Sequence, residues 1–408
     1  MHNAACETVQ VLPDRPENHT ISNTEADQFR KLLTLQEVKT LVNRALNRET
    51  NVLEFSLESY SEGKIGFLGS HKRLRVGIQS KSGKETIFFF VKTVPYDVPI
   101  HAEYVIKKGV FEKEAIFYRE IVPRLCAVYD DEPWAAACCM VKKDLIVFED
   151  LRNKGYTMRN KLFDKELVTA GLSTLARLHA ASLIAEEYLG KPLNQIFPYA
   201  FKEKAFCGVG ETRQWMDVGI NATVAIAKHL NLESSLISAA CKEVFLTIKA
   251  SSTKRNVVSH GDLWGNNLMF NNEVPPKCLL VDFQLVRYCP LAHDVAQFLY
   301  LCTDRGFREL WEDTMLKHYY SVLRKTLSSS KISVETPPWS EIVEGIEEQR
   351  FGALITAVLY FPTYVFHNRN EIVLANMKTD PEYGRRISET VTELVELCSR
   401  LDEIPKPT

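Results

Sequence analysis

The chain has 408 residues, of which 45% are hydrophobic and 25% are charged, a composition typical of a protein with a buried core. Its 50 basic and 52 acidic residues leave a formal net charge of −2, which gives no electrostatic reason to expect a nucleic acid or a membrane surface as partner. The length favours two subdomains over a single compact unit.

The N-terminal residues and the cysteines indicate where the protein works. Residues 1–22 include Asp14, Arg15 and two prolines but no apolar run, so we expect no secretory signal. No stretch approaches the roughly 20 apolar residues that a spanning helix needs, so no membrane span is predicted. The ten cysteines show no Cys-x-x-Cys spacing, which indicates neither a zinc site nor a disulfide framework. We therefore expect free thiols and a cytoplasmic protein.

The first part of the chain predicts a small antiparallel sheet with few helices. Residues 1–33 are polar and lack periodicity, so we predict a flexible N-terminal tail. Apolar residues at helical spacing predict helices at residues 34–48 and 110–124. Strand-like runs, several of them separated by glycine-containing turns, are expected at residues 51–59, 72–78, 86–94, 135–141 and 145–148.

After Leu151 helical patterns dominate the sequence. Helices are expected at residues 165–188, 212–230 and 232–250, with several more within residues 291–401. A single short strand-turn-strand segment interrupts them between Val257 and Arg287. We therefore predict an α+β fold with two lobes, a β-rich N-terminal lobe at residues 34–148 and a mainly helical C-terminal lobe at residues 149–408.

The segment around Asp262 carries the most specific chemical signal. Asn267 follows Asp262 by five residues, and Asp282 ends an apolar run fifteen residues after Asn267. Phosphoryl transfer from ATP needs a carboxylate that accepts the proton of the attacking hydroxyl, and an amide oxygen and a second carboxylate that hold Mg²⁺. The residue types and their order match, so we predict Asp262 as catalytic base, Asn267 and Asp282 as metal ligands, and ATP and Mg²⁺ as cofactors.

These short patterns also have a purely structural explanation. An Asp followed by an Asn at this spacing is common in turns, where both side chains hydrogen-bond nearby backbone. The combination with a strand-borne Asp282, in a helical half that follows a β-rich half, favours the phosphotransferase interpretation.

The second half of the same site is expected in the β-rich lobe. Phosphotransferases of this kind use a strand lysine that holds the α- and β-phosphates and a helix glutamate that holds the lysine. Lys92 ends the apolar run at residues 88–91, where an unpaired charge would be costly. In the next predicted helix Glu114 lies between apolar residues at helical spacing, whereas Glu112 falls to the side. We predict Glu114 as the partner of Lys92, with a solvated helix carboxylate as the alternative.

Two further segments are candidates for contacts with the nucleotide. Gly66, Gly69 and Ser70 lie in a link between two strands and could offer backbone N–H groups to phosphate, although an ordinary hairpin is an equal alternative. Glu149 and Leu151 lie where a strand runs into a polar connection, and exposed backbone there could hydrogen-bond adenine; a plain linker is the alternative. The pattern Gly-x4-Gly-Lys-Ser/Thr is absent, which disfavours a P-loop enzyme.

Three other residues have less specific interpretations. His179 lies among leucines on an apolar helix face, so we predict a satisfied core histidine rather than a catalytic one. Asp294 precedes an apolar run and is expected to cap a helix or to brace the catalytic loop. Trp264 lies inside that loop, where packing and substrate contact are equal alternatives.

The combined motifs resemble those of the ecdysteroid kinase-like family over roughly residues 35–400. The motifs that carry this resemblance are Lys92, Phe111-x-x-Glu114-x-x-Phe117-Tyr118, Glu149-Asp150-Leu151, Leu175-Ala176-Arg177-Leu178-His179-Ala180-Ala181-Ser182, His260-Gly261-Asp262-Leu263-Trp264-x-x-Asn267 and Val281-Asp282-Phe283-Gln284. The resemblance implies a protein-kinase-like bilobal fold, similar to that of choline and aminoglycoside kinases. It also implies ATP- and Mg²⁺-dependent phosphorylation of a small-molecule alcohol, which in founding members is an ecdysteroid.

Two departures from protein kinases point to the small-molecule branch. The usual Arg before the catalytic Asp is absent, since Gly261 precedes Asp262, and Gln284 replaces the Gly that follows Asp-Phe. We therefore expect a fixed catalytic loop rather than one switched by phosphorylation.

The acceptor alcohol stays open between an ecdysteroid, a xenobiotic alcohol, and choline or an amino sugar. A cationic acceptor would need an acidic or aromatic pocket, for which Glu309, Trp311 and Glu312 are candidates. The apolar stretch at residues 351–366 would suit a steroid. A catalytically inactive ligand-binding protein and a conventional protein kinase are the competing hypotheses.

Overall fold

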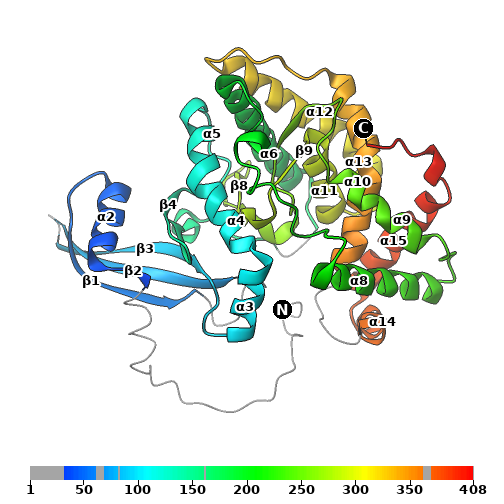
Figure 1. Ribbon diagram of the computed structural model, residues 1–408, viewed down its shortest axis with the longest axis horizontal. Helices are drawn as coiled ribbons and strands as arrows, with labels where there is room; N and C mark the ends of the chain where they lie inside the picture. The colour runs from blue at the N-terminus through cyan, green and yellow to red at the C-terminus, as the bar shows by residue number, and fades with distance from the viewer. Residues whose placement is uncertain (1–31, 61–68, 81–82, 160–161, 362–368, 408) are drawn as a thin grey trace.

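The computed structural model describes residues 32–60, 69–80, 83–159, 162–361 and 369–407 (Figure 1). Strands gather in the N-terminal part and helices fill the C-terminal part, which confirms the predicted α+β fold with a β-rich and a helical lobe. Most of the predicted tail, up to residue 31, lies outside the described residues. Leu33, the last residue of that prediction, is buried.

The N-terminal lobe is built on a five-stranded antiparallel sheet with the strand order β1-β2-β3-β5-β4. The strands are β1 (Asn51–Ser59), β2 (Ser70–Ser80), β3 (Gly83–Thr93), β4 (Cys138–Val141) and β5 (Leu145–Glu149). All five predicted strands are confirmed, although β4 begins three residues later than expected. Ala135 forms only an isolated bridge to Leu280.

The two faces of the sheet have different partners. Helix α2 (Leu35–Leu46) covers one face, where Phe89 and Val91 belong to a compact apolar cluster. Because successive strand residues point to opposite faces, Phe90 and Lys92 face the other way, toward the rest of the molecule. The alternation along β3 therefore places the Lys92 side chain on the face of the sheet that turns toward Glu114.

A helical segment between β3 and β4 differs in detail from the prediction of a single helix at residues 110–124. It comprises α3 (Pro99–Lys108), α4 (Val110–Ile116), a π-helical turn (Phe117–Ile121) and α5 (Val122–Val128). The sequence pattern missed α3 because few of its side chains are buried, and Gly109, with φ of 67°, separates α3 from α4. Such π-helical turns occur frequently near functional sites.

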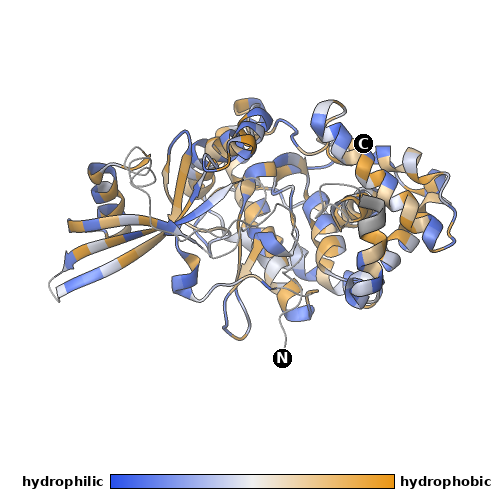
Figure 2. Cartoon of the chain, turned by 90° about the horizontal axis from the view of Figure 1, so that it is seen from below, coloured by the Kyte–Doolittle hydropathy of each residue, from blue (hydrophilic) through white to orange (hydrophobic). Residues whose placement is uncertain are grey.

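The C-terminal lobe is mainly helical, and hydrophobic and hydrophilic segments alternate along its helices (Figure 2). The buried hydrophobic residues of these helices belong to one large cluster. The longer helices of the lobe are α6 (Lys165–Leu189), α8 (Gly210–His229), α11 (Leu291–Cys302), α12 (Arg305–Ser329), α13 (Trp339–Tyr360), α14 (Arg369–Thr379) and α15 (Pro381–Cys398). Helix α6 has the length and hydropathy of a membrane span, but 78% of its most apolar window is buried inside the protein. The described cysteines are free thiols.

The helix predicted at residues 232–250 is wrong. The structure has only the short helices α9 (Ile237–Ala240) and α10 (Val244–Thr247), joined by a 3-10 turn. The first and last residues of both short helices are buried. The buried residues therefore recur at the three- to four-residue spacing of a helix, although the chain does not form one continuous helix there.

The single strand-turn-strand segment predicted between Val257 and Arg287 is also wrong, because four short strands form two separate pairs. Strand β6 (Asn256–Ser259) pairs with β9 (Arg287–Pro290), and β7 (Leu268–Phe270) pairs with β8 (Cys278–Leu280). The loop between β6 and β7 and the loop between β8 and β9 carry the residues with the strongest chemical signal.

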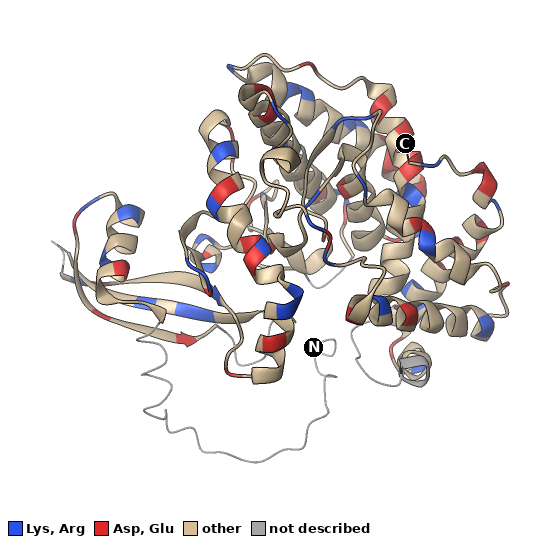
Figure 3. Cartoon of the chain, in the orientation of Figure 1, with Lys and Arg blue, Asp and Glu red and all other residues tan. Residues whose placement is uncertain are grey.

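Charged residues of both signs are interspersed over both lobes (Figure 3), and one buried carboxylate among them fastens the sheet to the connection after β5. Asp150 is 3% exposed and accepts hydrogen bonds from Arg73 Nε at 2.9 Å, Tyr60 Oη at 3.0 Å and Arg152 N at 3.1 Å. Arg73 belongs to β2 and Tyr60 directly follows β1, so Asp150 ties that end of the sheet to the start of the helical lobe.

Replacing Asp150 with alanine should therefore lower the free energy of unfolding by about 2 kcal/mol, because the variant leaves Arg73 and Tyr60 without their buried acceptor. Asp130→Ala removes an exposed carboxylate and is the matched control, with a change within about 0.5 kcal/mol. Urea unfolding measures both, and equal stability of the two variants would contradict the tethering role of Asp150.

Candidate active site

The loop between β6 and β7 is held by a buried carboxylate from helix α11. Asp294 accepts hydrogen bonds from the backbone N–H groups of His260 at 2.6 Å and Gly261 at 3.0 Å. His179 Nε2 lies 3.3 Å from Asp294, and its Nδ1 lies 2.7 Å from Tyr319 Oη. Burial alone would raise the pKa of Asp294, but the hydrogen bond and charge of His179 lower it to about 2. Asp294 thus braces the loop, and His179 is a satisfied core histidine, as predicted.

Gly261 has the one conformation in this loop that requires glycine. Its φ is 75°, and an added Cβ would lie 2.2 Å from the carbonyl oxygen of Leu285. Its own carbonyl oxygen accepts a hydrogen bond from Arg287 Nη1. The glycine before Asp262 therefore lets two backbone segments approach closely.

His260 ties the loop between β6 and β7 to the segment that leads from β8 to Asp282. Its Nε2 lies 2.9 Å from the carbonyl oxygen of Val281, and its Nδ1 accepts the N–H of Asp262 at 3.3 Å. A carbonyl can only accept and an amide N–H can only donate, so the imidazole is neutral and carries its proton on Nε2. The ring also packs against Phe283, with centroids 4.5 Å apart. The hydrogen bond from His260 Nε2 to the Val281 carbonyl fixes the loop relative to Asp282, the next residue.

The carboxylate of Asp262 is buried and held from two directions. Asn267 Nδ2 donates to Asp262 Oδ2 at 3.0 Å and to the Asp262 carbonyl oxygen at 2.8 Å. The Tyr360 hydroxyl also hydrogen-bonds the carboxylate. Burial and the nearby Asp282 charge raise the pKa of Asp262 to about 7, even though Asn267 and Tyr360 oppose that rise. The sequence did not single out Tyr360, which ends α13 within the apolar stretch proposed for a steroid.

Lys92 lies between two carboxylates from different parts of the chain. Its Nζ is 2.6 Å from Glu114 Oε2 and 2.7 Å from Asp282 Oδ1. Glu114 Oε1 also accepts the N–H of Phe283 at 3.2 Å. Burial alone would lower the pKa of Lys92, but the two carboxylates outweigh it and raise the pKa. Of the two glutamates weighed from the sequence, Glu114 makes this contact and Glu112 is exposed.

Asp282 adopts a backbone conformation that is unusual for a residue other than glycine. Its φ is 68° and its ψ is 67°, in the left-handed region, and such strain clusters at functional sites. Burial would raise its pKa, but the Lys92 ammonium outweighs burial and lowers it, so Asp282 is ionised. Phe283, the next residue, stacks on Phe117 of the π-helical turn at 4.7 Å between centroids. This stacking anchors the strained residue to the N-terminal lobe.

The donor groups near Asp262 fit Mg²⁺ better than a transition metal. The described residues contain no cluster of three or more His, Cys, Asp or Glu side chains that could hold a metal ion. The amide nitrogen of Asn267 donates to Asp262, so its amide oxygen could serve a metal, and Asp282 offers an ionised carboxylate. Mg²⁺ is commonly held by one or two protein oxygens, with phosphate and water completing its shell.

The structure describes four of the five other residues that were predicted to contact the nucleotide. Gly66 lies outside the described residues. Gly69 packs so closely on the lysine stem that an added Cβ would lie 3.1 Å from Lys92 Cε, and Ser70 begins β2. Glu149 Oε1 accepts the N–H of Ala137 at 2.9 Å.

The Leu151 side chain is buried, and its backbone carbonyl accepts the N–H of Tyr156 at 3.1 Å. The carbonyl of Leu151 therefore already has a partner within the chain. Trp264, whose role the sequence left open, is half-buried against the main core.

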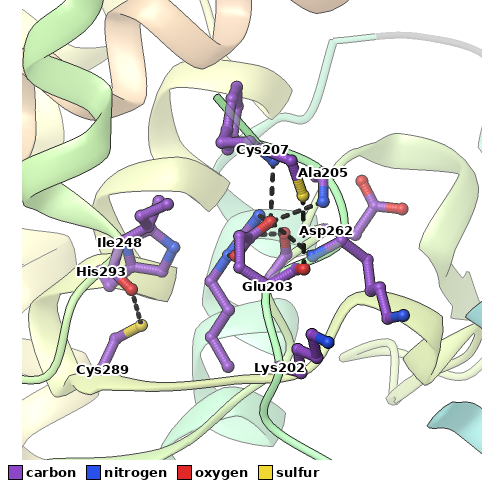
Figure 4. A network of polar contacts seen from close by, with 12 residues as sticks. Lys202, Glu203, Ala205, Cys207, Ile248, Asp262, Cys289 and His293 are labelled. Atoms are coloured by element: carbon purple, nitrogen blue, oxygen red, sulfur yellow. Dashed lines mark hydrogen bonds and ion pairs between the residues drawn. The ribbon is translucent and has the colours of Figure 1, made fainter. Parts of the chain in front are cut away.

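A partly buried ion pair behind the loop between β6 and β7 was missed from the sequence. Arg287 Nε lies 2.7 Å from Glu203 Oε2, and the other oxygen of Glu203 accepts backbone N–H groups of residues 204–206 (Figure 4). Lys113, which precedes Glu114 on α4, donates to the carbonyl of Lys202 at 2.7 Å. Burial alone would raise the pKa of Glu203, but the Arg287 charge outweighs it and lowers the pKa. No local motif marks these residues, because more than 80 positions separate Glu203 from Arg287.

Comparison with known proteins assigns the chain to a family. The model of the ecdysteroid kinase-like family matches residues 66–332 of the chain. No curated protein matches the chain.

Solved structures of low similarity also align with the chain. An ethanolamine kinase of Plasmodium vivax is 11% identical, with 92% of this chain and 87% of that chain covered and a TM-score of 0.41. A microcompartment-associated aminopropanol kinase is 13% identical, with coverages of 89% and 97% and a TM-score of 0.45. A putative aminoglycoside phosphotransferase from Ralstonia eutropha is 13% identical, with coverages of 88% and 98% and a TM-score of 0.43.

Replacing Gly261 with alanine should lower the free energy of unfolding by about 3 kcal/mol, because the new methyl group meets the backbone of Leu285 in a left-handed conformation. Gly265→Ala is the matched control in the same loop, since its Cβ would meet nothing closer than 3.7 Å, and its stability should change by less than about 1 kcal/mol. Thermal and urea unfolding compare the two variants. Similar losses in both would show that the close approach at Gly261 is not the cause.

Asp294→Asn should lower stability in a pH-dependent way. The folded pKa of about 2 lies below the ordinary value of 3.8, so the ionised group contributes stability above about pH 4 and loses it as the pH falls toward 2. The variant should thus be less stable than the wild type by about 2 kcal/mol at pH 7, and this difference should shrink at pH 3. Urea titrations at both pH values measure it, and a difference that stays constant would be the contrary result.

Proposed function

Because the chain belongs to the ecdysteroid kinase-like family, we propose that it is an ATP- and Mg²⁺-dependent kinase of small molecules. It transfers the γ-phosphoryl group to the hydroxyl of an ecdysteroid or another lipophilic alcohol, in the cytoplasm. The observation that carries this proposal is the buried Lys92 ammonium, which pairs with both Glu114 and Asp282. Phosphotransferases of this fold use such a lysine to hold the phosphates of ATP.

Asp262 is the general base of the proposed reaction. The acceptor oxygen forms a bond to the γ-phosphorus, the bond from that phosphorus to the β–γ bridging oxygen breaks, and ADP leaves. Asp262 takes the proton that the hydroxyl loses. A pKa of about 7 suits this role, because the carboxylate is then both substantially ionised and basic enough to accept a proton. Asn267 keeps one carboxylate oxygen fixed during the transfer.

The remaining predicted residues hold the nucleotide and the metal. Bound Mg²⁺ neutralises phosphate charge, and the amide oxygen of Asn267 and the carboxylate of Asp282 are its proposed ligands. Lys92 binds the α- and β-phosphates while Glu114 keeps the lysine in place. Gly69 and Ser70, at the start of β2, are proposed to lie against the phosphates; Gly66 was predicted with them and lies outside the described residues.

The connection at residues 149–151 is the proposed contact for the base. Glu149 and Leu151 were predicted there as nucleotide-binding residues. Since the carbonyl of Leu151 and the N–H of Glu149 have partners within the chain, at 3.1 and 3.0 Å, we propose that these two groups do not hydrogen-bond the base, which the connection contacts through its other atoms.

The aromatic side chains beside Asp262 offer ring surface that can pack against a lipophilic alcohol. Tyr360 contacts Asp262, the ring of Trp215 lies 5.9 Å from that of Tyr360, and Phe206 lies 6.1 Å from Trp215. The nearby carboxylate of Glu203 is paired with Arg287 and is therefore not a free partner for an ammonium group. An ecdysteroid and a xenobiotic alcohol both fit this environment.

The acidic and aromatic residues considered for a cationic acceptor are engaged elsewhere. Glu312 pairs with Arg350 at 2.7 Å and Glu309 with Arg305 at 2.8 Å. The ammonium group of Lys165 lies over the ring of Trp311, 3.7 Å from the ring centroid. These contacts make choline or an amino sugar a poorer candidate than a neutral alcohol.

The test measures Mg²⁺-dependent transfer of phosphate from ATP to a panel of ecdysteroids, other lipophilic alcohols, choline and an aminoglycoside. We expect transfer to a neutral lipophilic alcohol, and a fall of about 10²–10⁴-fold in kcat for Asp262→Asn. Asp313→Asn, which alters a carboxylate with 73% side-chain exposure, is the control that should keep full activity. Nucleotide binding without transfer to any acceptor would identify a ligand-binding pseudokinase, and transfer to generic proteins would identify a protein kinase.

A further inference from the structure

His71 lies on β2 directly opposite Lys92 on β3. The two residues are register partners in the antiparallel pair, as are Arg73 and Phe90 two positions further along. Directly opposed residues place their side chains on the same face of a sheet, with Cβ atoms about 5 Å apart. The imidazole of His71 is therefore on the face that carries Lys92 toward Glu114 and Asp282.

The position of the ring is fixed by its neighbours. Its centroid lies 5.2 Å from that of Phe90, with the planes tilted by 53°. An added Cβ on Gly69 would lie 3.7 Å from His71 Nε2 and 3.1 Å from Lys92 Cε. The backbone of Gly69, the stem of Lys92 and the edge of the imidazole thus meet at one point of the site, which is the point where the phosphates are proposed to bind.

The ring nitrogens of His71 have no hydrogen-bond partner among the described residues, and the residue is only half-buried. In this it differs from His260 and His179, whose ring nitrogens contact the chain on both sides. Burial and the Lys92 charge lower the pKa of His71 to about 4. The imidazole is therefore neutral near pH 7 and offers one N–H donor without adding charge beside Lys92.

We infer that His71 is a nucleotide-binding residue whose ring N–H donates a hydrogen bond to an ATP phosphate oxygen beside Lys92. The inference rests on the proposed function, because it needs ATP in this site. The competing explanation is that the ring only fills space above Phe90. The two differ in what they predict for ligands with and without phosphates.

The test is calorimetric binding of ATP, ADP and adenosine to the full chain in the presence of Mg²⁺. His71→Phe keeps an aromatic ring but removes the donor, so the Kd for ATP and ADP should rise about 10-fold while that for adenosine stays the same. His71→Gln restores a donor and should bring the Kd for ATP back to within about threefold of the wild type. His229→Phe, at the exposed end of α8, is the control and should change neither value.

Steady-state kinetics adds an independent measurement, in which the KM for ATP should rise for His71→Phe while the KM for the acceptor does not. Unchanged ATP binding by His71→Phe, or an equal loss for ATP and adenosine, would overturn the inference while leaving the kinase proposal intact. Absence of ATP binding by the wild type would overturn both. Should His71→Phe fail to fold, His71→Leu carries the same prediction.

Discussion

The burial of one positive charge constrains the whole molecule. Lys92 has a side-chain exposure of 5% and its two carboxylate partners come from α4 and from the segment after β8. An ammonium group removed from water is strongly destabilising unless it is paired. The strand, the helix and the segment after β8 must therefore come together in one arrangement. The cross-lobe stacking of Phe283 on Phe117 and the bonds to Asp150 add to a geometry that this charge already requires.

The same site contains more negative than positive charge. Lys92 faces both Glu114 and Asp282, and the charge of Asp282 contributes to the raised pKa of Asp262. Arg287, whose charge also acts on Asp262, is already paired with Glu203. One carboxylate therefore lacks a full counter-charge, and under the proposed function Mg²⁺ at Asp282 supplies it. Burial and, after it, the Asp282 charge raise the pKa of Asp262, and this same Asp282 charge would favour a divalent cation.

The sequence predicted the structure correctly where two residues in contact are close in sequence, or where one short pattern assigns a residue to a strand or helix. The spacing of Asp262 and Asn267 is read within a single loop, and the apolar run before Lys92 predicts a strand that delivers it to the sheet. It failed where distant segments decide the structure. Helix α3 buries too few side chains to show a pattern, and residues 237–247 keep helical spacing while forming separate short helices. The contacts of Tyr360 and Glu203 join segments far apart in sequence, so no window of the chain contains both partners.

The loop between β6 and β7 is held by side chains of Arg287, Glu203 and Asp294. In protein kinases that are switched by phosphorylation, an added phosphate pairs with arginine and orders the activation segment. In this chain the carboxylate of Glu203 is the partner of Arg287, and Arg287 binds the carbonyl of Gly261. Asp294 holds the N–H groups on the other side of the same loop. Because Glu203 is ionised without any modification, the loop can keep its contacts without a phosphorylated residue, which is the physical reason behind the expectation of a fixed loop.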